Sequence, residues 1–219
     1  MSKLILFQGD SITDGGRNRD DLASMGESYA YMVKGQLGCE YPGEYEFINK
    51  GISGNRIVDI YARIKNDIIN LKPDYMSLLI GVNDVWHELG GMYNGVDAEK
   101  FEKIYEMLIL EILEALPNIK IMILEPFVLE ATATTATEEE PERLNYFRTE
   151  VSLRAAAAKR IAEKYGLPFV TLQDKFDAAC KWEQAHYWLE DGVHPTPMGH
   201  WIIKNAWVEV FQGMQKTEC

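Results

Sequence analysis

The chain opens with LILFQGDS, residues 4–11, in which a short apolar run leads into a glycine-containing turn. An apolar run of this length is typical of a strand buried on both faces of a parallel sheet. Ser11 then lies at the carboxyl end of that strand, where open α/β sheets bind their ligands. Near the other end of the chain, the segment DGVH places Asp191 and His194 three residues apart. A serine hydroxyl needs a neighbouring base to become a nucleophile, so the two segments together predict a serine hydrolase.

The rest of the chain alternates between apolar runs and longer stretches with helical spacing. Four further runs predict strands at Tyr45–Ile48, Tyr75–Ile80, Ile119–Leu124 and Phe169–Leu172. Helices are predicted over Arg56–Leu71, Phe101–Leu116, Leu144–Tyr165 and Pro197–Phe211. Such alternation predicts an α/β fold of three layers, with a five-stranded parallel sheet covered by helices on both faces. We expect a single domain over residues 1–219, because no linker interrupts the pattern.

Composition and charge exclude several classes of protein. The 219 residues include 34 acidic and 22 basic side chains, which gives a formal net charge of -12. An acidic surface repels polyanions, so we expect neither nucleic acid nor an anionic membrane surface as a partner. No apolar run approaches the roughly 20 residues of a membrane-spanning helix, and no signal peptide is recognised, so we expect a cytoplasmic protein. The three cysteines, Cys39, Cys180 and Cys219, are odd in number and widely spaced, which predicts reduced thiols.

Two more polar segments belong at the same edge of the predicted sheet as Ser11. NKGISGN, residues 49–55, follows the second strand, and GVND, residues 81–84, follows the third. A glycine lets the backbone approach a substrate closely, and an asparagine amide can donate a hydrogen bond. Acyl transfer needs such donors where the carbonyl oxygen becomes an oxyanion. These segments make a plain turn at Gly9-Asp10-Ser11 the weaker interpretation.

Together these segments resemble the sequence blocks of the SGNH, or GDSL-like, hydrolase family, which adopts a flavodoxin-like fold. The resemblance implies that Ser11 is the nucleophile, that His194 is the general base, and that Asp191 orients the imidazole. It also implies an oxyanion hole made by the backbone N–H groups of Ser11 and Gly51 and by the side-chain amide of Asn83. The blocks occur in the family order and extend over most of the chain.

One further serine and three further histidines are not assigned to catalysis. Ser53 lies in a sequence that only half resembles a Gly-x-Ser-x-Gly nucleophile elbow, so we reject it as the nucleophile. His200 is expected to pack on the closing helix, and His87 to lie at the surface. For His186, a place in an aromatic cleft wall and a place in the core stay open. None of these histidines has a partner at metal-ligand spacing, so we predict no metal and no other cofactor.

Two acidic residues and two loops complete the candidates. Asp10 and Asp84 are expected to hold loop backbones through local hydrogen bonds. His87–Gly95, with three glycines, predicts a surface loop. Ala131–Glu140 is either a solvated connection or a mobile wall of the active site.

The substrate class is predicted only from a closer resemblance to one group of enzymes within this family. The segments GDSITDGGR, NKGISGN and IGVNDVW are similar to those of acetylxylan esterases and related carbohydrate acetylesterases. This implies removal of acetyl groups from xylo-oligosaccharides or similar sugars. Trp86 and Trp188 are candidate substrate-binding residues, because indole rings offer flat faces to sugars, although both could equally pack in the core.

Two alternatives stay open. One is a short-chain lipid esterase or lysophospholipase of the same family. The other is a carbohydrate-binding protein without catalytic activity. The sequence leaves undetermined which sugar hydroxyl is deacetylated, how long an acyl chain is accepted, and whether the chain forms a homo-oligomer.

Overall fold

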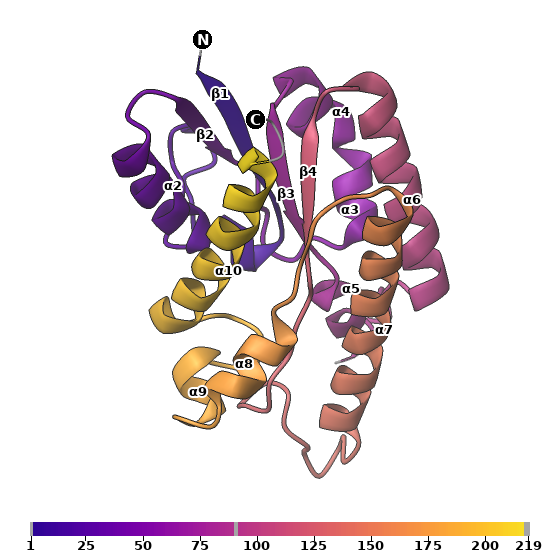
Figure 1. The fold of residues 1–219 in the computed structure, drawn as a ribbon. Coiled ribbons are helices and arrows are strands. Elements are labelled where there is room, and N and C mark those ends of the chain that lie inside the picture. The colour runs from indigo at the N-terminus through magenta and orange to yellow at the C-terminus, as the bar shows by residue number, and fades with distance from the viewer. Residues whose placement is uncertain (1, 90–91, 217–219) are drawn as a thin grey trace.

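The fold is built on one parallel sheet with the strand order β2-β1-β3-β4-β5 (Figure 1). The structure is a computed structural model that describes residues 2–89 and 92–216. The strands are β1 (Lys3–Gly9), β2 (Tyr45–Asn49), β3 (Tyr75–Leu79), β4 (Lys120–Leu124) and β5 (Phe169–Val170). The predicted α/β class and five-stranded parallel sheet are therefore confirmed. β3 and β4 are each one residue shorter than predicted, and β5 is two residues shorter, since its pairing with β4 covers two residues.

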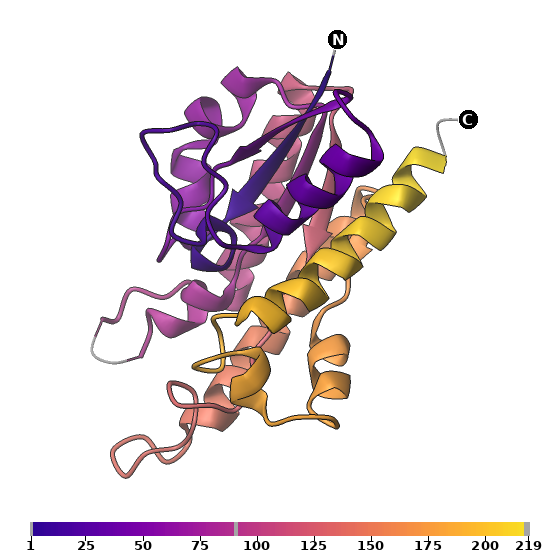
Figure 2. The same ribbon diagram turned by 90° about the vertical axis from the view of Figure 1, so that its left-hand side faces the viewer.

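Helices cover both faces of this sheet. They are α1 (Ser11–Asp14), α2 (Tyr29–Glu40), α3 (Ile57–Ala62), α4 (Ile64–Asp67), α5 (Val82–Trp86), α6 (Ala98–Ala115), α7 (Arg143–Lys164), α8 (Gln173–Ala179), α9 (Ala185–Trp188) and α10 (Pro197–Lys216). In Figures 1 and 2, α2 and α10 lie against one face, and α3, α6 and α7 lie against the other.

Side-chain alternation along each strand divides the core into two halves. Ile5 and Phe7 of β1 point into the cluster shared with α2 and α10, whereas Leu6 points into the cluster shared with α3, α6 and α7. Successive side chains of a strand face opposite sides of the sheet, so strands with helices on both faces must be apolar throughout. This is why the strands read as continuous apolar runs in the sequence.

The helix predicted over Arg56–Leu71 is broken in the structure. It consists of α3, α4 and a 3₁₀ turn at Ile69–Leu71. Arg63, between α3 and α4, has φ -111° and ψ 13°, outside the helical region. Its guanidinium donates to Lys50 O and Asn55 Oδ1, both at 2.9 Å. These contacts tie the break to the loop after β2.

The pattern did not predict α1, α2, α5, α8 or α9. Helix α2 contains Gly35 and Gly38, which lower helix propensity. The other four helices are too short to show a helical repeat in the sequence. Among the described residues no helix has the length and apolarity to cross a membrane.

Cys39 and Cys180 are free thiols, as predicted. Met1, Cys219 and Gly90-Gly91 of the predicted surface loop lie outside the described residues.

The loop after β2 packs tightly on α1. Asn49 donates through its side-chain amide to Thr13 O at 2.6 Å and to Met25 O at 2.7 Å. Gly51 lies so close to α1 that a Cβ atom there would stand 2.3 Å from Asp14 N. The absence of a side chain at Gly51 therefore allows β2 and α1 to approach each other.

We predict that Gly51→Ala lowers the free energy of unfolding by about 3 kcal/mol, because the new methyl group overlaps backbone atoms that cannot move aside. Thermal or urea unfolding measures the change. Gly38→Ala in α2 is the matched control, since nothing lies within 4 Å of its added Cβ, and it should stabilise by about 0.5–1 kcal/mol. Equal stabilities for Gly51→Ala and the unsubstituted protein would contradict this packing argument.

Candidate active site

A line of hydrogen bonds joins the two ends of the chain at the carboxyl edge of the sheet. Ser11 Oγ lies 2.8 Å from His194 Nε2, although 183 residues separate them. His194 Nδ1 lies 2.7 Å from Asp191 Oδ2. If the neutral imidazole carries its proton on Nδ1, it donates to Asp191 and accepts from the Ser11 hydroxyl. The structure thus brings together the predicted nucleophile, base and orienting carboxylate.

Ser11 is the first residue of α1, at the point where β1 ends. Asp10 caps this helix, because its Oδ1 accepts from Ile12 N at 3.0 Å. Gly9 allows the sharp turn, since a Cβ there would lie 2.4 Å from Thr13 Oγ1 and 2.5 Å from Leu79 O. The turn projects the Ser11 side chain beyond the sheet edge, where it is only half-buried.

The Asp191–His194 loop is held by hydrogen bonds of its own. Asp191 Oδ1 accepts from Val193 N at 2.9 Å and from His194 N at 2.8 Å, so one carboxylate orients both the loop backbone and the imidazole. The loop after β4 packs against the Asp191–His194 loop. Leu129 N donates to Gly192 O at 2.9 Å, and Ala133 N donates to Asp191 O at 3.0 Å.

The contact between Ala133 N and Asp191 O bears on the interpretation of Ala131–Glu140 as a solvated connection. The first residues of this segment support the Asp191 loop, and Thr134 is fully buried, whereas most of the later residues are exposed. A purely solvated connection is therefore the wrong description of residues 131–135.

The pKa values of Asp191 and His194 are shifted in opposite directions. Partial burial works against ionisation of Asp191, but hydrogen bonds from His194 and from the backbone of Val193 lower its pKa to about 2. The hydrogen bond to Asp191 raises the pKa of His194 above its ordinary value of 6.5, against the effect of burial. Asp191 is therefore ionised at neutral pH and favours the protonated form of His194.

Asn83 stands close to this line, on α5 after β3. Its side chain is buried, and Nδ2 donates to Asn55 O at 3.1 Å, which leaves its second N–H for another acceptor. Ser11 N is at the first position of α1, where a backbone N–H has no partner within the helix. These two predicted donors can both serve a ligand.

Gly51 does not fit the predicted role. Its N–H already donates to Asn49 Oδ1 at 2.9 Å, and the residue is packed against Asp14. Gly54, three residues later, has φ +81° and open space where a Cβ would stand. Within the described residues its N–H donates to no protein atom. Sequence reasoning chose the first glycine of the segment, whereas the structure leaves the N–H of the second one for a ligand.

Asp10 holds its own loop through a local hydrogen bond from Ile12 N, as predicted, whereas the contact of Asp84 is not local. Both carboxyl oxygens of Asp84 lie within hydrogen-bond distance of Ile57 N, at 3.1 and 3.2 Å. Burial raises the pKa of Asp10 to about 7 and that of Asp84 to about 8.

Of the two candidate aromatic residues, Trp86 is beside the imidazole. Its ring centroid is 6.0 Å from that of His194, and it packs edge-on against Phe147 at 5.6 Å. Trp188 is half-buried and donates through Nε1 to Glu183 O at 3.3 Å. It lines a separate hollow with Trp182 and Trp201.

The remaining histidines are not part of this line. His200 is buried on α10, where its Nδ1 accepts from Tyr29 N at 3.2 Å, as the predicted packing role requires. His87 is half-buried and His186 is exposed on α9. Across residues 2–89 and 92–216, no group of three or more His, Cys, Asp or Glu side chains is placed to hold a metal ion.

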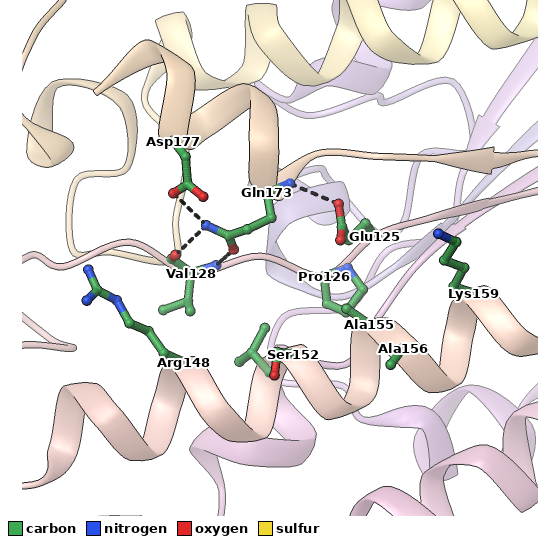
Figure 3. A pocket seen from close by; sticks show the side chains of 11 residues that line it. Glu125, Pro126, Val128, Arg148, Ser152, Ala155, Ala156, Lys159, Gln173 and Asp177 are labelled. Atoms are coloured by element: carbon green, nitrogen blue, oxygen red, sulfur yellow. Dashed lines mark hydrogen bonds between the residues drawn. The ribbon is translucent and has the colours of Figure 1, made fainter. Parts of the chain in front are cut away.

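A cavity of about 480 Å³ lies elsewhere, between α7 and α8 (Figure 3). Gln173 is one of the lining residues, and its side chain accepts from Val128 N at 3.0 Å and donates to Asp177 Oδ1 at 3.0 Å. None of the predicted site residues is among those lining it: Glu125, Pro126, Val128, Arg148, Val151, Ser152, Ala155, Ala156, Lys159, Gln173 and Asp177. The cavity is therefore separate from the Ser11 site.

The sequence is similar to those of known hydrolases. The model of the GDSL-like lipase/acylhydrolase family matches residues 7–202. An acetylxylan esterase of Geobacillus stearothermophilus is 35% identical over 215 residues, which cover 93% of this chain and 91% of the relative.

Solved structures agree. A protein described as a GDSL-like lipase from Parabacteroides merdae superposes with a TM-score of 0.87 at 34% identity, covering 95% of this chain and 96% of the other. Two catalytic mutants of Axe2, an acetylxylan esterase from Geobacillus stearothermophilus, superpose with a TM-score of 0.82 at 32% identity, covering 95% and 94%. One of these mutants replaces an aspartate and the other a serine.

We predict that Asp191→Asn lowers the pKa of His194. The substitution removes the negative charge that stabilises the imidazolium, while burial, which disfavours the imidazolium, remains. NMR titration of the imidazole C–H protons measures the pKa of His194 in the unsubstituted protein and in Asp191→Asn. His87, whose pKa is lowered by burial and by the charge of Arg56, is the internal control and should not change, because neither Asp191 nor His194 contributes to its shift. An unchanged His194 titration in Asp191→Asn would show that the carboxylate does not set the pKa of His194.

Proposed function

Because the chain belongs to the GDSL-like lipase/acylhydrolase family and is a carboxylic ester hydrolase, we propose that it uses Ser11 to remove acetyl groups from acetylated xylo-oligosaccharides or similar sugars. The observation that carries the proposal is the hydrogen-bonded line Ser11–His194–Asp191. A nucleophile, a base and a group that orients the base form the triad that serine hydrolases use for acyl transfer.

In the first half of the reaction, Ser11 Oγ attacks the acetyl carbonyl carbon while its proton passes to His194 Nε2. The ionised Asp191 stabilises the imidazolium that forms. When the tetrahedral intermediate collapses, the bond to the sugar oxygen breaks, and His194 returns the proton to that oxygen. The products of this half are a free sugar hydroxyl and acetyl-Ser11.

In the second half, water takes the place of the sugar. His194 accepts a proton from the water as its oxygen attacks the acetyl carbon. Collapse of the second intermediate releases acetate and restores the Ser11 hydroxyl, to which His194 gives back the proton. No net proton remains on the imidazole, so the cycle can repeat.

Both tetrahedral intermediates carry a negative oxygen that needs fixed donors. We assign this role to Ser11 N–H, to the unused N–H of the Asn83 amide, and to Gly54 N–H in place of Gly51. Gly54 lies between two anchored neighbours. Ser53 N donates to Asp14 Oδ2 at 2.9 Å, and Asn55 O accepts from Asn83. These contacts place Gly54 between the helix that carries Ser11 and the helix that carries Asn83.

The position of Trp86 favours a substrate with a small acyl group. This residue is one helical turn after Asn83 and in ring contact with His194, so it borders the space around the reacting carbonyl. Phe147, fully buried behind it, prevents the indole from moving back. The likeness to acetylxylan esterases adds the sugar part of the proposal, and the acidic surface suits a neutral substrate.

We predict that Ser11→Ala lowers acetate release from acetylated xylo-oligosaccharides by a factor of about 10⁴ or more, because the nucleophile is lost. Acetate is measured over a panel of acetylated sugars and p-nitrophenyl esters. Ser53→Ala is the matched control, since this serine is in the neighbouring loop and its hydroxyl donates to Asp14. Full activity of Ser11→Ala would refute the nucleophile, and activity on simple esters without any on sugars would refute the substrate.

We predict that Trp86→Ala raises the preference for octanoate over acetate esters by about tenfold, because removing the indole opens room for additional methylenes. The ratio of kcat/KM for the two p-nitrophenyl esters measures this. Trp182→Ala is the control, because Trp182 is 87% exposed and outside the line of site residues. An unchanged ratio in Trp86→Ala would show that the indole does not limit the acyl chain.

A further inference from the structure

Two consecutive residues of α5 hold the same short segment of the neighbouring loop. Asn83 Nδ2 donates to Asn55 O at 3.1 Å, and the carboxyl group of Asp84 accepts from Ile57 N at 3.1 and 3.2 Å. The segment between these contacts begins one residue after Gly54. The position of Gly54 N–H therefore depends on both side chains of α5.

Asp84 is itself fixed in place. Its side chain is fully buried. Val96 N donates to Asp84 O at 2.8 Å, and the guanidinium of Arg154, only 3% exposed, donates to Val96 O at 2.6 Å. Burial and these contacts restrict the movement of Asp84, so its carboxyl group can hold Ile57 N in a defined position.

The contact with Asp84 sits at the start of α3, where a backbone N–H has no partner within the helix. Arg56, the N-cap residue, provides no side-chain hydrogen bond for this end of α3. The acceptor for Ile57 N thus comes from a different element, α5. A contact between elements sets their relative position, which a cap within one element does not.

We propose that Asp84 is a positioning residue for the oxyanion site: by holding Ile57 N, it fixes Gly54 N–H relative to the Asn83 amide. This inference rests on the proposed function, in which Gly54 and Asn83 donate to the same oxygen. Asp84 touches no substrate in this scheme. It acts through the loop that carries Gly54.

The electrostatics of Asp84 suit this role. Burial raises its pKa to about 8, against the opposing effects of Ile57 N–H and Arg154. Burial therefore favours the protonated, uncharged form of the carboxyl group. That form can accept from Ile57 N without placing a full negative charge near an oxyanion.

The first test compares kcat with KM in two variants of Asp84. Asp84→Ala removes the acceptor and should lower kcat about 10- to 100-fold with little change in KM, since a displaced donor acts only in the transition state. Asp84→Asn keeps an acceptor oxygen and should stay within about fivefold of the unsubstituted enzyme. Asp59→Ala is the control, because Asp59 caps the same helix through Arg56 N but does not join it to α5.

Equal kcat values for Asp84→Ala and the unsubstituted enzyme would overturn the proposal. So would an equal loss in Asp59→Ala, which would point to general loosening of α3.

A second pair of variants tests the donor side, in case Asp84→Ala does not fold. Ile57→Pro removes the N–H at the first helical position, where proline is tolerated, and Arg56 already has the extended φ and ψ that precede proline. Ile57→Val keeps the N–H with a similar loss of side-chain volume. Ile57→Pro should lose kcat as Asp84→Ala does, and Ile57→Val should keep it. Equal kcat in the two variants would overturn the proposal.

The direct readout is the amide proton of Gly54 in ¹H–¹⁵N NMR spectra, before and after a fluorophosphonate forms a tetrahedral adduct on Ser11. In the unsubstituted enzyme we expect a downfield shift at Gly54 and none at Gly51. In Asp84→Ala the Gly54 shift should shrink. The absence of a Gly54 shift in the unsubstituted enzyme would refute the proposed oxyanion donor, whereas equal shifts in both proteins would refute only the role of Asp84.

Discussion

The hydrogen bond between Ser11 Oγ and His194 Nε2, 2.8 Å long, is the contact on which the rest of the site depends. It can form only if the first strand lies inside the sheet and the last loop returns to the same sheet edge. The strand order β2-β1-β3-β4-β5 meets the first condition, and the contacts of the β4 loop with Gly192 and Asp191 meet the second. The whole fold thus serves to bring two short segments together.

Acidic side chains hold each loop of this edge by accepting backbone N–H groups. Asp10 caps α1, Asp14 holds Ser53, Asp84 holds Ile57, and Asp191 holds its own loop and His194. Burying a carboxyl group is costly unless it is hydrogen-bonded or protonated. Burial raises the pKa values of Asp10 and Asp84 despite their hydrogen bonds, whereas hydrogen bonds from His194 and the backbone of Val193 lower the pKa of Asp191.

Sequence reasoning succeeded where one strong local signal decides the outcome. The apolar runs predicted the strands because burial on both faces leaves no other pattern, and the segments around Ser11 and His194 predicted which side chains meet. It failed where a distant contact decides. The break at Arg63 depends on the loop after β2, and the choice between Gly51 and Gly54 depends on an Asn49 side chain that occupies one N–H. The role inferred for Asp84 depends on its contact with Ile57, which only the structure shows.

The mechanism requires that Ser11 becomes acylated during turnover. Rapid acid quenching of the enzyme with an activated acetyl ester, followed by peptide mass spectrometry, detects this acylation. We expect one added acetyl group on the peptide that contains Ser11, formed within the first turnover and absent from Ser11→Ala. An acetyl group on any other residue, or turnover with no acylated peptide, would contradict it.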